Sequence, residues 1–150
     1  MTPQEMELSD LADIIQMERS AFGKMAWSST DFERAIGSAY DHPLVLRTLK
    51  SGTERTVAYA VLRILGPEAE IENICVAEEC REQGLGEALM DAMLQRAESS
   101  GAAKVYLEVR SRNLPARRLY EKKGFLQEYV RKDYYEAPRD DALIMALSLT

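Results

Sequence analysis

With 150 residues, 46% of them hydrophobic, the chain is long enough for one domain that spans residues 1–150 and buries roughly two-thirds of its unfolded surface. Its net charge of −6 and pI near 4.9 argue against a nucleic-acid-binding protein and favour a basic partner. No apolar run approaches the ~18 residues of a membrane-spanning helix, and the acidic N-terminus lacks the basic region of a signal peptide, so we expect a cytoplasmic protein outside the membrane.

Hydrophobic periodicity predicts an alternation of strands and helices. Seven segments are predicted as strands: residues 4–8, 44–49, 57–65, 69–76, 105–110, 125–131 and 142–149. Four are predicted as helices: one from an N-cap at Ser9 to about Phe22, one capped by Ser28 or Ser29, one over 84–100, and one from Asn113 to Gly124. Strand and helix alternate only in the middle of the chain. The predicted fold class is therefore α/β (α+β), with a mixed central sheet of about seven strands and about four helices on both faces.

The most informative segment is 71–94, where a β-branched run ends in a short polar loop and a long amphipathic helix follows. Gly84 and Gly86 open that helix, and without Cβ atoms they let a phosphate approach several backbone N–H groups. The helix N-terminus adds roughly half a positive charge. Arg81, just before the glycines, adds a full charge. The segment predicts a pyrophosphate cradle.

Three alternatives compete with this interpretation. A Rossmann fingerprint needs a third glycine, but Leu89 stands in its place, and half of the chain precedes the loop. A phosphate-binding P-loop would end in Gly-Lys-Ser/Thr, which the chain lacks. The third alternative is a glycine-rich turn that binds no ligand, and the Gly-x-Gly motif alone does not exclude it.

The motif Arg81-x-x-Gly84-x-Gly86 and the downstream segment Asn113-x-x-Ala116-x-x-Leu119-Tyr120-Glu121-Lys122-x-Gly124-Phe125 resemble two signatures of the GNAT superfamily of acetyl-coenzyme A-dependent N-acetyltransferases. Within it, the chain is most similar to the bacterial ribosomal-protein-alanine N-acetyltransferases. The supporting segments are 26–28 with Phe32, 107–110, 133–135 and 141–145. The sequence departs from that pattern at Arg81, where Gln is common, and after Tyr135, where the usual Pro is absent.

The resemblance implies the GNAT fold and acetyl-coenzyme A (acetyl-CoA) as co-substrate, with no metal. The residues that it assigns to the coenzyme are Ile74, Cys75, Val76, Arg81, Glu82, Gln83, Gly84, Leu85, Gly86 and Asn113. Backbone N–H groups at 74–76 would polarise the thioester carbonyl. The strand they belong to should be splayed from the strand at 105–110, leaving a slot for the pantetheine arm. Two cysteines and a single histidine form neither a zinc set nor a disulfide framework.

Glu108 is the candidate general base, because it lies on the strand face opposite Val105, Leu107 and Val109. From the pattern alone, a solvated glutamate balanced by Arg110 is the commoner interpretation. The resemblance reverses that preference, since these enzymes place their proton acceptor in the Leu-Glu-Val-Arg segment. A carboxylate near pKa ~4.3 is a weak base toward an ammonium, so we expect a raised pKa or a water relay.

Tyr120 is the candidate general acid. It follows Asn113 by two helical turns, so the two residues face the same side. The alternatives are an amphipathic tyrosine covering the sheet, and for Asn113 a simple N-cap rather than a ligand of the pantetheine arm. A tyrosine pKa of ~10 exceeds the ~8.5 of a thiol, so full proton transfer to the thiolate costs roughly 2 kcal/mol. We expect Tyr120 to act mainly as a hydrogen-bond donor.

Tyr134 and Tyr135 are candidates for the wall of the acceptor site, with cross-strand packing as the alternative. Together these observations predict acetyl transfer by direct attack to the α-amine of a basic protein N-terminus, as the resemblance implies for the N-terminal alanine of a ribosomal protein. Acetylation of a lysine or a small amine is a second possibility. A catalytically inert acyl-CoA sensor, from a different class, could lose Glu108 and Tyr120, and both are present. The oligomeric state is not predicted.

Overall fold

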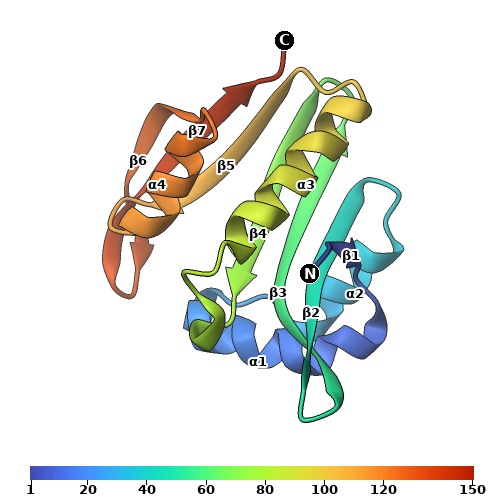
Figure 1. The fold of residues 1–150 in the computed structure, drawn as a ribbon. Helices are drawn as coiled ribbons and strands as arrows, with labels where there is room; N and C mark the ends of the chain where they lie inside the picture. Colours follow the sequence, from blue (N-terminus) through green and yellow to red (C-terminus); the bar gives the residue numbers. More distant parts are fainter.

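A seven-stranded sheet in the order β1-β2-β3-β4-β5-β7-β6 forms the centre of the computed structural model, which describes residues 1–150 (Figure 1). Its strands are β1 (Gln4–Glu5), β2 (Asp41–Lys50), β3 (Thr53–Leu65), β4 (Glu68–Val76), β5 (Lys104–Arg110), β6 (Leu126–Glu136) and β7 (Arg139–Ser148). Every neighbouring pair is antiparallel except β4 and β5, which run parallel. The sheet is therefore mixed, as predicted from the sequence.

Helices cover both faces of the sheet, as Figure 1 shows. They are α1 (Leu11–Phe22), α2 (Ser29–Gly37), α3 (Leu85–Ser99) and α4 (Leu114–Lys122), with 3-10 turns at Leu8–Asp10, Gly23–Met25 and Glu78–Cys80. One apolar core packs α3 and α4 against the sheet, and a smaller one packs α1 and α2 against the opposite face of β2, β3 and β4. We call these the α3 face and the α1 face. No helix in the structure has the length and apolar character needed to cross a membrane.

The N-terminal elements differ from the prediction in detail. Strand β1 is only two residues long, and Ser9 lies inside a 3-10 turn instead of capping α1. Asp10 is the residue before α1, and its side chain accepts a hydrogen bond from the Glu7 backbone N–H at 2.8 Å. At α2, by contrast, Ser28 is the N-cap, as predicted: its side chain accepts a hydrogen bond from the Asp31 backbone N–H.

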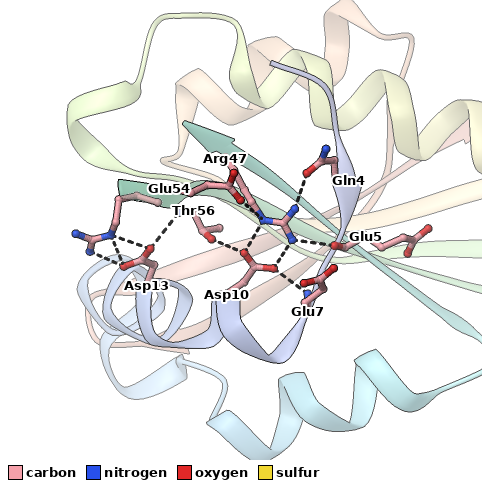
Figure 2. Close-up of polar contacts among 9 residues, drawn as sticks. Gln4, Glu5, Glu7, Asp10, Asp13, Arg47, Glu54 and Thr56 are labelled. Atoms are coloured by element: carbon pink, nitrogen blue, oxygen red, sulfur yellow. Dashed lines mark hydrogen bonds and ion pairs between the residues drawn. The ribbon is translucent and has the colours of Figure 1, made fainter. Parts of the chain in front are cut away.

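Asp10 is drawn inward by Arg47 of β2 (Figure 2). Arg47 Nε and Nη2 donate to the two Asp10 carboxylate oxygens at 2.9 and 2.7 Å, and Thr56 of β3 donates to the same carboxylate at 2.6 Å. Burial raises the pKa of Asp10, but the hydrogen bonds from Arg47 and Thr56 outweigh it, so the net pKa is lowered. Since Asp10 is only 4% exposed, this network fixes the start of α1 on the sheet.

Beyond their first residues, β4 and β5 separate. Their ladder joins Glu68–Ile71 to Lys104–Leu107 and then ends, although both strands continue. This confirms the splay that the family resemblance implied. Figure 1 shows the gap widening toward the start of α3 and α4.

A bulge in β4 accompanies the splay. Val61 of β3 pairs with Asn73 and Leu62 pairs with Ile71, so Glu72 is an extra residue in β4. Ile71 packs in the core under α3, whereas Cys75 packs in the core under α1. Asn73, which is bonded to Glu18 of α1, also lies on the α1 face.

We expect Arg47→Gln to destabilise the fold strongly, because it leaves the buried Asp10 carboxylate without its guanidinium. Breaking a buried pair typically costs about 3–5 kcal/mol. Arg34→Gln is the matched control, since Arg34 pairs with Asp31 on the surface with 73% of its side chain exposed, and exposed pairs contribute about 0–1 kcal/mol. Urea unfolding measures both variants. Equal losses of unfolding free energy would contradict the structural importance of the Asp10 network.

Candidate active site

The loop before α3 presents a row of free backbone donors. Glu82 and Gly84 adopt left-handed conformations, with φ of 63° and 80°. None of the N–H groups of residues 82–87 has an acceptor in the protein, whereas Ala88 N–H donates to Gly84 O at 3.0 Å and begins the helical ladder. Such a turn, followed by a helix N-terminus, forms an anion-binding concavity. The free donors of residues 82–87 are compatible with the pyrophosphate site that the sequence predicts, which stays a prediction.

The two glycines of the loop differ in what the fold itself requires. Gly84 has a positive φ, a backbone conformation that residues other than glycine rarely adopt. Gly86 has an ordinary backbone conformation, and a Cβ there would meet Leu119 at 3.5 Å, an ordinary van der Waals contact. The fold alone does not demand a glycine at 86. A ligand that approaches the backbone closely at this position would explain why it is a glycine.

Arg81 lies beside this loop, and its Nε donates to Val76 O at 3.4 Å. On the other side, Lys122 and Lys123 donate to Glu87 in the first turn of α3 at 2.8 and 3.0 Å. The hydrogen bond from Lys122, followed by that from Lys123, lowers the pKa of Glu87 to about 2. These contacts join α3 to α4 at the wide end of the splay.

The backbone N–H groups of Ile74, Cys75 and Val76, which were predicted to contact the coenzyme, do not all point the same way. Ala77 N–H donates to Val57 O at 2.8 Å, so the N–H of Cys75, two residues earlier, also faces β3. The N–H groups of Ile74 and Val76 face the opposite way, toward the splay. The Cys75 side chain is buried in the core under α1, and burial raises the pKa of its thiol.

A pocket of about 520 Å³ occupies the splay on the α1 face. It brings together residues that lie far apart in the sequence: Trp27, Ile74, Glu108, Asn113, Tyr120 and Tyr135. The candidate base and the candidate acid thus line one cavity, which opens beside the strand edge carrying the free N–H groups. The polar loop, that edge and the pocket together make up the candidate active site.

Glu108 projects from the α1 face of β5, opposite the buried Val105, Leu107 and Val109. Its side chain is 32% exposed, and the Arg131 guanidinium lies 3.9 Å from its carboxylate. Burial raises the pKa of Glu108, the Arg131 charge opposes the shift, and the nearby Glu70 charge adds to it. The net pKa is raised, in the direction expected for a base that acts on an amine.

Tyr120 is 6% exposed and packs against Phe125, with ring centroids 6.1 Å apart. Burial raises the pKa of its hydroxyl to about 12. The hydroxyl therefore stays protonated at neutral pH and is available as a donor. The gap to a thiol pKa of ~8.5 is wider than for an ordinary tyrosine, which favours hydrogen-bond donation over full proton transfer.

Asn113 caps α4, since its Oδ1 accepts a hydrogen bond from Ala116 N–H at 3.3 Å. The turn before it is anchored by the buried Asp140, which accepts hydrogen bonds from the Ser111 hydroxyl and, at 3.1 Å, the Arg112 N–H. Capping occupies the amide oxygen of Asn113. Its Nδ2 donates to no protein atom and remains available to a ligand in the pocket.

The two tyrosines of β6 line different pockets. Tyr135 lines the Glu108 pocket and lies under Arg110, whose guanidinium carbon is 4.0 Å from the ring centroid. Tyr134 packs edge-on against Tyr135, with centroids 5.2 Å apart, and lines an adjoining cavity with Arg131. Both tyrosines belong to a β6–β7 hairpin that is longer than the sequence predicted.

The wall of the pocket is acidic. Four glutamates line it, namely Glu18, Glu70, Glu72 and Glu108, against the cations Lys24 and Arg110. Burial, followed by the hydrogen bond and charge of Asp41, raises the pKa of Glu72 to about 8. No three His, Cys, Asp or Glu side chains are arranged so that they could hold a metal ion.

Sequence reasoning missed Glu18 and Asn73 as members of this wall. Glu18 is 1% exposed, and its carboxylate accepts hydrogen bonds from Tyr59, Asn73 and Trp27. A signal for Glu18 was present, because it shares helical spacing with the apolar Leu11 and Ile14 of α1. Asn73 gave no such signal, since its orientation depends on the bulge at Glu72.

The family model for the acetyltransferase (GNAT) family matches residues 9–125, and the chain belongs to this family. It is thus an acetyl-CoA-dependent N-acetyltransferase.

Particular relatives can also be named. The ribosomal protein bS18-alanine N-acetyltransferase of Escherichia coli K12 is 33% identical over 151 residues, which cover 99% of this chain and 98% of the relative. The enzyme of the same name from Salmonella typhimurium is 31% identical, with coverage of 97% and 95%. The crystal structure of the ribosomal-protein-S18-alanine N-acetyltransferase from Escherichia coli superposes with a TM-score of 0.84 at 31% identity, covering 99% of this chain and 94% of that one.

We expect Gly86→Val to abolish acetyl-CoA binding while the protein remains folded, because the side chain would occupy the space between a phosphate and the loop N–H groups. Gly37→Val is the matched control, since Gly37 also lies in a helix without a positive φ, and a Cβ there would meet no atom within 4 Å. Calorimetry with acetyl-CoA and thermal unfolding are measured on both. A folded Gly86→Val variant with parental affinity would contradict the cradle.

Proposed function

We propose that this enzyme acetylates the α-amine of a protein N-terminus by direct attack of the amine on the thioester. The observation that carries the proposal is the acidic pocket at the end of the coenzyme cleft, where Glu108 and Tyr120 line one cavity. A wall rich in carboxylates suits a cationic acceptor. The names of the relatives make the N-terminal alanine of a ribosomal protein the first acceptor to test.

Glu108 is assigned as the general base. An α-amine has a pKa near ~8 and is partly neutral at pH 7, so a carboxylate with a raised pKa is sufficient to take its proton. The pocket position of Glu108 and its upward pKa shift both support this role. The neutral amine attacks, and as the N–C bond forms and the C–S bond breaks, the Glu108 carboxylate receives the proton that leaves the nitrogen.

Tyr120 is assigned as the donor to the sulfur that departs. Its raised pKa supports a hydrogen bond that strengthens as negative charge develops, without full transfer of the proton. The N–H groups of Ile74 and Val76 are the proposed donors to the thioester carbonyl oxygen. Asn113 Nδ2 is the proposed contact to the pantetheine arm, and Tyr135 the proposed wall of the acceptor site. Tyr134 lines the adjoining cavity and is the proposed contact to the acceptor residues that follow the N-terminal one.

We expect Glu108→Gln to lower kcat by about two to four orders of magnitude at neutral pH, because an amide cannot accept the amine proton. Acetyl-CoA affinity should change little. In the parent, kcat/KM should fall as the pH drops through the raised pKa of Glu108, since only the carboxylate form is active. The variant should lack that acidic limb.

Two neighbouring substitutions serve as controls with opposite signs. Glu70→Gln removes a charge that raises the pKa of Glu108, so the acidic limb should move to lower pH. Arg131→Gln removes a charge that lowers this pKa, so the limb should move to higher pH. If the acidic limb of kcat/KM keeps its position in both variants, the group that titrates is not Glu108.

The acceptor itself is tested with two basic peptides of matched sequence. One has a free N-terminal alanine, and the other is N-terminally blocked and carries an internal lysine. We expect faster acetylation of the first, because a lysine with pKa ~10.4 is neutral only about once in a thousand molecules at neutral pH. Mass spectrometry identifies the modified amine. Preference for the blocked peptide would favour a lysine or small-amine acetyltransferase instead.

A further inference from the structure

Asn73 lines the Glu108 pocket, and its side-chain oxygen has no partner in the protein. Asn73 is 8% exposed, and its Nδ2 donates a hydrogen bond to Glu18 Oε1 at 3.0 Å. Oδ1, at the other side of the same planar amide, is buried and accepts no hydrogen bond. Buried oxygens are nearly always paired, because leaving one without a donor is costly. An unpaired oxygen in a pocket wall therefore indicates where a donor from a ligand binds.

The orientation of the Asn73 amide is fixed by Glu18. The Glu18 carboxylate also accepts hydrogen bonds from Tyr59 Oη at 2.6 Å and from the Trp27 N–H at 2.9 Å. An ionised carboxylate only accepts hydrogen bonds, so it must be met by the N–H side of the amide. Oδ1 is accordingly held away from Glu18.

Asn73 and Glu108 share one face of the sheet on the two strands that flank the splay. Their neighbours Ile71 and Leu107 are the last paired residues of β4 and β5, and both pack under α3. Glu108 follows Leu107 directly and so faces the α1 side. The bulge at Glu72 turns Asn73 to that same side, and both residues line the same pocket.

We propose that Asn73 Oδ1 binds the acceptor amine by accepting a hydrogen bond from one of its N–H groups, while Glu108 takes the proton from another. This inference rests on the proposed function. An amide oxygen is not basic enough to remove a proton, so it orients the amine and leaves deprotonation to the carboxylate. With one N–H directed at each of these two acceptors on facing strands, the lone pair of the neutral amine points away from both of them, toward the thioester. Solvent does not reach Oδ1, so a small movement of the pocket wall accompanies the contact.

The test compares Asn73→Ala with Tyr59→Phe. Each substitution removes one hydrogen bond to Glu18, but only Asn73→Ala also removes the unpaired oxygen. We expect Asn73→Ala to lower kcat/KM for the free-alanine peptide roughly ten- to a hundredfold, as for loss of a hydrogen bond to a charged group. Its acetyl-CoA affinity, measured by calorimetry, should stay parental, and Tyr59→Phe should keep most of its kcat/KM. If Asn73→Ala does not fold, Asn73→Leu supplies a side chain of similar branching that lacks the oxygen.

Three outcomes would overturn the assignment. Unchanged kcat/KM in the folded Asn73 variant would remove Asn73 from the acceptor site. Equal losses in Asn73→Ala and Tyr59→Phe would reduce Asn73 to a partner of Glu18. Weakened acetyl-CoA binding would assign Oδ1 to the coenzyme. A parent enzyme that fails to acetylate any free N-terminal peptide would refute the proposed function itself, a result distinct from these three.

Discussion

The separation of two parallel strands governs the organisation of this enzyme. Where the β4–β5 ladder ends at Ile71 and Leu107, each strand keeps an edge of backbone polar groups without a neighbouring strand. Such an edge in a sheet interior needs another partner, because buried backbone groups are rarely left unpaired. A pantetheine arm, which carries amides of its own, suits that requirement. The break also creates the volume in which Glu108 and Tyr120 lie together.

Two cores hold the separated halves in position, and a buried charge lies at the edge of the smaller one. Glu18 of α1 joins Tyr59 of β3, Asn73 of β4 and the backbone of Trp27 before α2. A carboxylate in such a position is tolerated only when its oxygens are hydrogen-bonded. Since its three donors come from three elements, the charge makes the placement of α1 specific. The Glu18 hydrogen bonds thus tie α1 to this side of the pocket, while the unpaired strand edges remain open to ligands.

Much of the fold could be predicted because local signals agreed with it. The strand period at 105–110, the cap at Ser28 and the glycines of the α3 loop each rest on neighbours a few residues away. The predicted cap at Ser9 was wrong, because the start of α1 depends on a distant residue. The guanidinium that draws Asp10 inward comes from Arg47, 37 residues later. The same limit applies to the pocket. Glu108 and Tyr120 were found through motifs, whereas the opposite directions of the Cys75 and Ile74 N–H groups follow only from the pairing with β3.

The bulge at Glu72 has an evolutionary consequence. In a regular strand, consecutive side chains alternate between faces, but here the extra residue lets Glu72 and Asn73 both line the Glu108 pocket. Ile71 before the bulge and Cys75 after it already sit in their own cores. Deletion of one residue at this point would restore regular alternation and change the side chains that line the Glu108 pocket, while Ile71 and Cys75 keep their faces. The lining of this pocket can thus change through the loss of a single codon, without a change in either core.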